Sequence, residues 1–170
     1  MAKQLILVRH GKAENQLPDS SDFDRKLTNR GRRDATEMAE RLKARSIKPS
    51  YLFSSPAPRA LETGEIFSRV WDLDPQTITT DISVYEASVK ALLKAVNRFP
   101  DKADTAVMFG HNPGIAQLAM ILTDADIYDV PTAGVVVITF DGHTWAEISG
   151  NTGTMLLFDY PELPFTPARD

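Results

Sequence analysis

The chain contains no cysteine, and this absence excludes disulfides, thiolate metal sites and cysteine nucleophiles together. It has only three histidines, whereas a zinc site needs several converging ligands, so we expect no metal and no other cofactor. No apolar run approaches the ~20 residues of a membrane-spanning helix. Residues 1–4 lead directly into an apolar run and leave no room for a signal peptide. These absences favour a cytoplasmic protein without membrane attachment.

A surplus of positive charge is also missing, because 19 Lys and Arg face 23 Asp and Glu for a net charge of -4. This balance gives no general electrostatic reason to bind nucleic acid or an anionic membrane surface. The length of 170 residues and the apolar content of 42% are typical of one soluble globular domain with a sizeable core. We therefore expect a single domain over residues 1–170.

A short apolar run near the start of the chain ends in a basic tripeptide. Leu5 to Val8 are four apolar residues in a row, as in a strand buried on both faces of a parallel sheet. Arg9, His10 and Gly11 follow, where ligands bind outside the carboxyl ends of strands in open α/β sheets. We expect Gly11 to allow a sharp turn. Alone, the tripeptide is weak evidence, since a histidine after a strand is often an ordinary loop residue.

The remaining pattern alternates between helices and strands. A polar loop is expected over 12–26, and Thr28 is expected to cap a helix that ends near Ser46. Ser54 or Ser55 would cap a later helix that begins with prolines. The other expected elements are strands over 51–53, 77–82 and 105–109, and helices from about 58 to 71, over 89–96 and over 115–122.

Near the C-terminus the pattern changes to consecutive strands. Residues 135–140, a turn at 141–143 and residues 145–148 predict a β-hairpin, with a further edge strand over 154–158. The proline-rich tail is expected to be irregular; its prolines are Pro161, Pro164 and Pro167. Together these elements predict an α/β fold, a three-layer α/β/α sandwich with a central, mostly parallel sheet and a C-terminal hairpin.

Four loops that follow predicted strands carry residues suited to phosphate chemistry. Arg9 and His10, Arg59, Glu86 and His111 could all face one crevice. The planar fork of arginine binds phosphate oxygens bidentately. The helix expected after His111 would add backbone N–H donors and its dipole. The predicted ligand is therefore a phosphoryl group.

A histidine nucleophile must be neutral and keep a lone pair on one ring nitrogen. Neighbouring guanidinium groups would lower the pKa of His10, and a hydrogen bond from its other nitrogen to a backbone carbonyl would fix the tautomer. Glu86 is the nearest candidate acid for the leaving group. Phosphoryl transfer depends mostly on positioning and charge stabilisation, so arginines and histidines can serve without a metal.

Four motifs together resemble the histidine phosphatase superfamily, which has the phosphoglycerate-mutase-like fold. They are Arg9-His10-Gly11; Leu27-Thr28 with Gly31; Ser54-Ser55-Pro56 with Arg59-Ala60 and Glu62-Thr63; and Gly110-His111-Asn112-Pro113-Gly114. The resemblance implies a reaction through a phosphohistidine intermediate on His10. It also implies that Arg9, Arg59 and His111 bind the phosphoryl group, and that Glu86 stands where many members place the acid.

Within the superfamily the chain is most similar to the SixA-type phosphohistidine phosphatases. The similarity lies in residues 12–14, in residues 22–25 ahead of Leu27-Thr28, and in the small size. An open site would admit a phosphorylated protein side chain, or small phosphate esters loosely. Members of this type differ at the acid position, and phosphohistidine needs acid assistance less. Glu86 could therefore indicate activity on true phosphate esters.

Several roles remain open at the level of sequence. Arg25 could reach the phosphate from its loop or be solvated, and Asn15 and Asn112 could donate to phosphate oxygens or stabilise turns. Glu86 could equally be a solvated residue ahead of a helix. The alternatives to a phosphatase are a phosphomutase, which the small size disfavours, and a phosphate- or phosphoprotein-binding module without turnover. The substrate, any protein partner and the oligomeric state are left undetermined.

Overall fold

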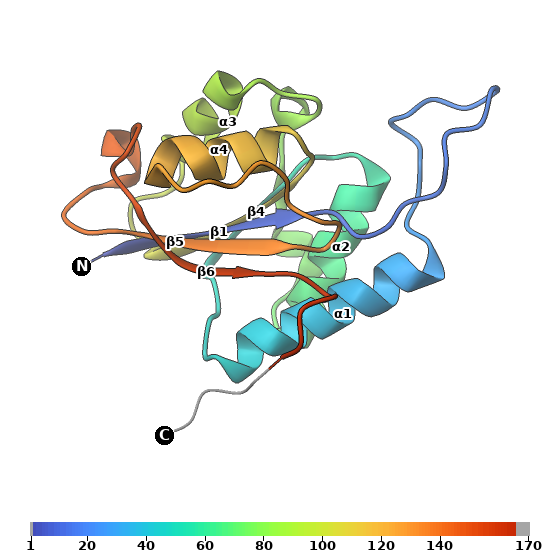
Figure 1. Ribbon diagram of the computed structural model, residues 1–170, viewed down its shortest axis with the longest axis horizontal. Helices are drawn as coiled ribbons and strands as arrows, with labels where there is room; N and C mark the ends of the chain where they lie inside the picture. Colours follow the sequence, from blue (N-terminus) through green and yellow to red (C-terminus); the bar gives the residue numbers. More distant parts are fainter. Residues whose placement is uncertain (1, 166–170) are drawn as a thin grey trace.

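A six-stranded sheet in the order β3-β2-β4-β1-β5-β6 runs through the middle of the molecule (Figure 1). The computed structural model describes residues 2–165. The strands are β1 (Lys3–Arg9), β2 (Tyr51–Ser54), β3 (Thr79–Thr80), β4 (Thr105–Gly110), β5 (Val135–Phe140) and β6 (Thr154–Asp159). β1, β2, β3 and β4 pair in parallel, whereas β5 is antiparallel to both β1 and β6. The prediction of a mostly parallel sheet is confirmed.

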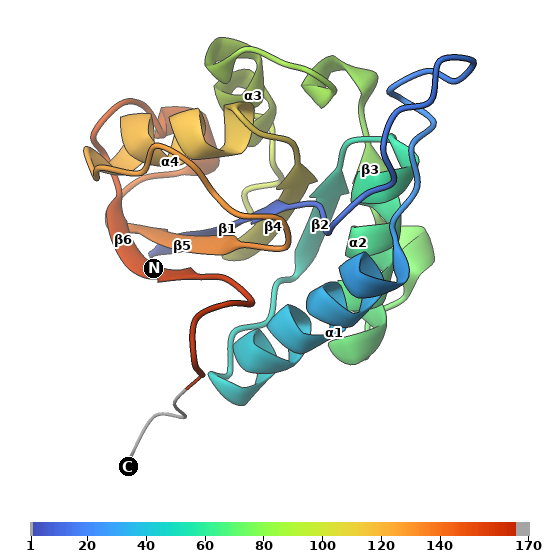
Figure 2. The same cartoon turned by 45° about the vertical axis from the view of Figure 1, so that its right-hand side comes forward.

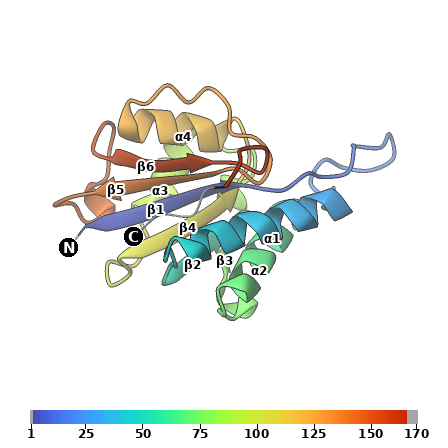
Figure 3. The same cartoon turned by 60° about the horizontal axis from the view of Figure 1, so that its bottom comes forward.

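Helices cover both faces of this sheet. They are α1 (Asn29–Ala44), α2 (Pro58–Val70), α3 (Val89–Val96) and α4 (Gly114–Thr123), with short 3-10 turns η1 (Pro75–Thr77), η2 (Ile82–Val84) and η3 (Trp145–Glu147). α1 and α2 lie on one side and α3 and α4 on the other (Figures 1 and 3). The predicted three-layer sandwich is therefore confirmed. No helix within residues 2–165 has the length and apolarity needed to span a membrane.

The alternation of side chains along β1 explains its unbroken apolar run. Ile6 and Val8 pack into the core beneath α1 and α2, whereas Leu5 and Leu7 pack into the core beneath α3 and α4. All four are fully buried. Since both faces of the strand are covered by helices, neither set of alternate residues needs to be polar.

The two predicted helix caps have different outcomes. Thr28 caps α1 as predicted, and its Oγ1 accepts a hydrogen bond from the backbone N of Gly31 (3.0 Å). The prediction that Ser54 or Ser55 caps α2 is wrong, because the N-cap is Ala57, which has no side-chain cap. Ser55 Oγ accepts from Ala57 N (3.2 Å) one residue before the helix begins. The Ser55 side chain is directed towards the candidate site instead.

The predicted hairpin over 135–148 is wrong in its second half. Trp145 to Glu147 form the turn η3, and the antiparallel partner of β5 is β6, which confirms the predicted edge strand. Trp145 is fully buried and its Nε1 donates to the carbonyl of Ala103 (2.7 Å). The buried residues Trp145 and Ile148 are three positions apart, which suits one face of a helical turn rather than a strand.

The strand predicted over 77–82 is reduced to the two residues of β3. It is bounded by η1 and η2, which each begin at an aspartate. Asp74 accepts from Gln76 N (2.9 Å), and Asp81 accepts from Ser83 N (2.9 Å). These local side-chain bonds to the backbone compete with extended structure and shorten the strand.

The polar loop over residues 12–26 projects beyond the helices and is closed at its base (Figure 2). Ala13 forms a bridge with Leu27, and Thr28 N donates to Lys12 O (2.9 Å). Gly11 lies against the first turn of α1, where an added Cβ would be 2.7 Å from the carbonyl oxygen of Gly31. A glycine is therefore required at position 11 because the two backbones pack closely, and not because of a positive φ. Within residues 2–165, Gly142 is the only glycine with a positive φ.

The tail after β6 is irregular, as its prolines predict. Residues 160–165 form neither helix nor strand, and Pro167 lies outside the described residues. Arg41 of α1 is 6% exposed and holds the start of the tail. Its Nη1 donates to Asp159 Oδ1 (3.0 Å) and to Tyr160 O (3.1 Å). A buried guanidinium paired in this way fixes the tail to α1.

Candidate active site

The carboxyl ends of three neighbouring strands bring two histidines and a serine together. The parallel register pairs Arg9 of β1 with Gly110 of β4, so His10 and His111 leave the sheet side by side. His10 N donates to Gly110 O (3.0 Å), and on the other side of β4 Ser55 N donates to Phe109 O (3.0 Å). The rings of the two histidines are 5.3 Å apart between centroids.

His10 has one ring nitrogen occupied and one directed towards an arginine. Its Nδ1 is 2.7 Å from the carbonyl oxygen of Gly11, which can only accept, so Nδ1 carries the proton and Nε2 keeps the lone pair. Arg59 Nε is 3.4 Å from this Nε2. Burial first, and then the neighbouring His111, Arg59 and Arg9, lower the pKa of His10 to about 3, although the hydrogen bond to Gly11 acts in the opposite direction. The imidazole is therefore neutral at pH 7 and keeps its lone pair on Nε2, where Arg59 Nε donates a long hydrogen bond to it, and a nucleophile requires such a lone pair.

Arg59 lies in the first turn of α2 and is 4% exposed. Its Nη1 donates to the backbone carbonyl of Asp22 (2.7 Å) and its Nη2 donates to Asp22 Oδ2 (2.9 Å). Thr63, one helical turn further on, donates to Arg59 O (2.7 Å) and accepts from Gly11 N (3.1 Å). This threonine connects the helix that carries the arginine to the loop that carries His10, a role that sequence reasoning did not assign to it.

Ser55 forms a hydrogen bond with His111, a contact that sequence reasoning missed. Ser55 Oγ is fully buried and lies 2.8 Å from His111 Nε2. The Ser55 hydroxyl accepts from Ala57 N and can donate its own proton to Nε2, and in that arrangement the ring proton of His111 lies on Nδ1. Nδ1 is buried and has no partner within the described part of the chain. Burial and then Arg59 lower the pKa of His111 to about 4, so it is a neutral donor.

Arg9 and Asn112 both hold the loop that precedes β5. Arg9 Nη1 donates to the carbonyl of Val130 (2.9 Å). The Asn112 amide donates to the same carbonyl (2.8 Å) and to Asp129 Oδ1 (2.6 Å). The N–H groups of Asn112 are thus directed at the protein itself, and its predicted contact with phosphate stays a prediction.

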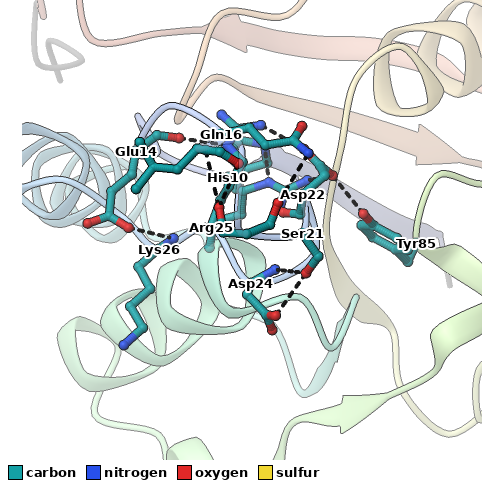
Figure 4. Close-up of polar contacts among 12 residues, drawn as sticks. His10, Glu14, Gln16, Ser21, Asp22, Asp24, Arg25, Lys26 and Tyr85 are labelled. Atoms are coloured by element: carbon teal, nitrogen blue, oxygen red, sulfur yellow. Dashed lines mark hydrogen bonds and ion pairs between the residues drawn. The ribbon is translucent and has the colours of Figure 1, made fainter.

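A carboxylate that the sequence did not single out, Asp22, lies between Arg25 and Tyr85 (Figure 4). Asp22 accepts from Arg25 Nη1 at Oδ1 (2.9 Å), and from Arg59 Nη2 (2.9 Å) and the Tyr85 hydroxyl (2.6 Å) at Oδ2. The Tyr85 hydrogen bond, followed by the contacts with Arg25 and Arg59, holds the pKa of Asp22 well below its usual range. Burial, with the hydrogen bond to Asp22, raises the pKa of Tyr85 to about 12.

The remaining predicted residues lie further out. Glu86 is exposed on the rim of a cleft of about 310 Å³ whose lining also includes His111 and Asn112. Its φ of 49° is in the left-handed region, an uncommon conformation for glutamate. Asn15 is exposed in the projecting loop, where it lines a separate hollow with Arg25. Arg25 is brought to the site through Asp22, whereas Asn15 is not brought to the histidines.

No group of three or more His, Asp or Glu side chains within residues 2–165 is arranged to hold a metal ion. The charges around His10 are instead supplied by arginines. Arg9, Arg25 and Arg59 surround two neutral imidazoles, with Asp22 as the counter-charge. Such a set binds and polarises a tetrahedral oxyanion by charge-assisted hydrogen bonds.

The lowered pKa values predict that acid weakens the fold through this site. Between pH 6.5 and about 4, the unfolded chain binds protons that folded His10 and His111 exclude. The contribution of the two neutral histidines to the free energy of unfolding should therefore be complete above pH 6.5. The free energy of unfolding should decrease as pH falls through this window, by up to about 1.4 kcal/mol per pH unit for each histidine. Urea unfolding at about pH 7 and about pH 5 measures the decrease.

The comparison uses two histidine variants. His111→Asn should show a smaller decrease between the two pH values than the wild type, because one of the proton-excluding groups is gone. His143→Asn removes the histidine of the turn after β5, outside the site, and should behave as the wild type. A decrease that is identical in all three proteins would contradict the assignment.

Comparison with protein-family models matches residues 5–86 to the histidine phosphatase superfamily, branch 1. Among curated proteins, the uncharacterized protein Rv1276c of Mycobacterium tuberculosis is 28% identical over 165 residues, which cover 91% of this chain and 99% of that protein. The chloroplastic uncharacterized protein At3g52155 of Arabidopsis thaliana is 25% identical over 162 residues, 90% of this chain and 73% of its own length.

Solved structures share the fold over nearly the whole chain. A candidate phosphohistidine phosphatase SixA from Agrobacterium tumefaciens has a TM-score of 0.80 at 23% identity, covering 94% of this chain and 98% of that one. The protein histidine phosphatase SixA in complex with tungstate has a TM-score of 0.78 at 20% identity, covering 93% and 97%. The mycobacterial glucosyl-3-phosphoglycerate phosphatase Rv2419c has a TM-score of 0.67 at 14% identity, covering 94% and 100%. These likenesses confirm the predicted fold.

Proposed function

We propose that this chain is a phosphatase of the histidine phosphatase superfamily, whose family model matches residues 5–86, and that it works through a phosphorylated His10. One observation carries the proposal. The Nε2 lone pair of a buried, neutral His10 lies 3.4 Å from the guanidinium of Arg59, with Nδ1 held by a backbone carbonyl. A nucleophile and an oxyanion-binding group are thus adjacent, which favours turnover over mere binding.

The reaction has two displacements at phosphorus. His10 Nε2 forms a bond to phosphorus while the bond from phosphorus to the leaving group breaks. Arg9, Arg59 and the Nδ1–H of His111 donate to the phosphoryl oxygens, whose charge the arginines stabilise. Water then forms a bond to phosphorus and the N–P bond breaks. This step returns neutral His10 and releases inorganic phosphate.

Glu86 gives its proton to the leaving group in the first step and accepts one from water in the second. Its position on the rim of the cleft beside His111 supports this role, since a leaving group departs towards the open side. Protonation matters most for an alkoxide leaving group, whereas an imidazole leaves readily. The importance of Glu86 therefore depends on the substrate class.

The substrate is either phosphohistidine on a protein or a small phosphate ester. Two of the solved structures with this fold are described as phosphohistidine phosphatases of the SixA type, one of them bound to tungstate. Another with the same fold is described as a glucosyl-3-phosphoglycerate phosphatase. The intact acid position favours activity on esters as well as on phosphohistidine.

A substrate panel with Glu86→Gln tests these assignments. We expect the wild type to hydrolyse a phosphohistidine peptide and an aryl phosphate, and to hydrolyse sugar phosphates more slowly. Glu86→Gln should lower kcat on sugar phosphates by about 10²-fold while changing phosphohistidine hydrolysis far less. Release of inorganic phosphate measures each rate.

Glu40→Gln, on the exposed face of α1, is the matched control and should match the wild type on every substrate. An equal loss on all substrates in Glu86→Gln would contradict the acid role. Binding of phosphate without turnover on any substrate would contradict the phosphatase assignment itself and favour a binding module.

A further inference from the structure

All three nitrogens of the Arg59 guanidinium have partners within the protein. Nε faces His10 Nε2, and both terminal nitrogens donate to Asp22, one to its backbone carbonyl and one to its carboxylate. Under the proposed function, these are the nitrogens that a phosphoryl group bound to His10 must use. Each terminal nitrogen keeps a second N–H, so a phosphoryl group that binds Nε and one terminal nitrogen shares Arg59 with the Asp22 carboxylate. The fork formed by the two terminal nitrogens becomes available only when Asp22 is displaced.

The carboxylate of Asp22 is held much as a phosphate would be. Its two oxygens accept charge-assisted bonds from Arg25 and Arg59. One of them also accepts a hydrogen bond from the Tyr85 hydroxyl (Figure 4). Its side chain is 28% exposed, so it lies at the boundary between the buried arginine and solvent. An anion in this place reduces the positive charge that an incoming ligand meets.

We propose that Asp22 is an internal anion that competes with the phosphoryl group for Arg59 and thereby determines which anions the site accepts. This inference rests on the proposed function, which assigns Arg59 to the phosphoryl group. A phosphomonoester or phosphoryl dianion offers up to three oxygens and two charges, more than the carboxylate it displaces. A diester monoanion offers two oxygens and one charge, the same as the Asp22 carboxylate. It therefore does not displace Asp22 from Arg59 and is excluded from the site.

The displacement is feasible because little else fastens the tip of the loop to the site. The base of the loop is closed by backbone bonds near Ala13 and Leu27, but beyond it the bonds of Ser20, Ser21 and Asp24 are local to the loop. The loop meets the opposite side of the site through Asp22 and through an edge-to-face contact between Phe23 and Tyr85 at 5.1 Å. Asp22 can move with the tip while the base stays closed.

Titration calorimetry with inorganic phosphate tests the competition without requiring turnover. Asp22→Asn keeps the size of the side chain and removes its charge. We expect it to bind phosphate about tenfold more tightly than the wild type, equal to about 1.4 kcal/mol. Tyr85→Phe, which removes one donor to Asp22 but keeps the ring, should tighten binding about threefold. Dimethyl phosphate should bind measurably to Asp22→Asn and not to the wild type.

Asp24→Asn is the matched control. This carboxylate lies two residues further along the same exposed loop and bonds to Ser21 rather than to an arginine. It should bind phosphate as the wild type does, and thermal unfolding should show that all variants are folded. Should Asp22→Asn not fold, Tyr85→Phe decides the result by itself.

The outcomes separate this inference from the proposed function. Tighter phosphate binding in Asp22→Asn with no turnover by any form supports the internal anion and contradicts the phosphatase. Normal turnover by the wild type, with equal or weaker phosphate binding in Asp22→Asn, overturns the internal anion and leaves the phosphatase intact. Absence of phosphate binding in every form overturns the inference too.

Discussion

The His10→Ala variant is expected to stay folded and to lose hydrolysis by about 10⁴-fold or more, a loss of the size seen when a nucleophile is removed. The reason is that the lone pair on Nε2 is the atom that attacks phosphorus, and neighbouring arginines cannot replace it. The measurement is initial-rate hydrolysis of an aryl phosphate, combined with trapping of ³²P on the protein. Because the N–P bond is labile in acid, the trapping uses a quench in alkaline denaturant.

Two further variants make this result specific. His10→Asn retains a side-chain donor for the Gly11 carbonyl and serves if the alanine variant is unstable, because it too lacks the nucleophile. His143→Ala removes a histidine from the turn after β5 and should keep full turnover and full labelling. Label that persists on His10→Ala, or turnover within tenfold of the wild type, would exclude His10 as the nucleophile.

The proximity of His10 and His111 could be predicted from the sequence because it depends on how the strands pair in the sheet. Each histidine follows an apolar run, and parallel neighbouring strands end at the same edge. Arg59 follows from the same reasoning, since it lies in the first turn of the helix after β2. Backbone register alone fixes these three positions, so patterns of apolar residues are sufficient to predict them.

Asp22, Tyr85 and Ser55 could not be predicted in the same way. Asp22 lies in a polar loop without periodicity, and its contacts with Arg59 and Tyr85 span 37 and 63 residues. The path of a loop through space decides such contacts. The position of Ser55 just before a proline-led helix predicts a helix cap. Its side chain bonds to His111 from the neighbouring strand, a direction that no local pattern encodes.

The errors in the fold have a similar origin. The stretch Trp145 to Ile148 contains β-forming residues, but the buried indole needs an acceptor, and it finds one at Ala103 by forming a turn. The sequence predicts that Gly11 allows a sharp turn. A glycine is required there because the backbone packs against Gly31, twenty positions away in sequence. The motif Arg9-His10-Gly11 and the motif that contains Gly31 are therefore in direct contact. Tertiary contacts override local preference in both cases.

The Arg59→Lys variant is expected to lower kcat by about 10²-fold to 10³-fold while leaving the protein folded, the size of loss seen for one oxyanion donor. Lysine keeps the positive charge beside Asp22, so no carboxylate is left unpaired in the site. It lacks the planar fork, however, and cannot face His10 Nε2 and bind two phosphoryl oxygens together. Steady-state kinetics on an aryl phosphate, with kcat and KM resolved, measure the effect.

A second bidentate arginine of this chain provides the matched control. Arg32 of α1 contacts Glu62 through Nε (2.7 Å) and Nη2 (3.5 Å), but on the surface. Arg32→Lys should change neither kcat nor KM by more than about twofold, since exposed ion pairs contribute little.

The division of the loss between kcat and KM decides what Arg59 does. Its Nε lies beside the attacking nitrogen, so its bonds to the phosphoryl oxygens strengthen as phosphorus moves towards His10. A loss mainly in kcat is therefore expected, because the interaction is stronger in the transition state than in the bound substrate. A loss confined to KM would show that Arg59 only binds the ground state. Activity within threefold of the wild type would remove Arg59 from the site altogether.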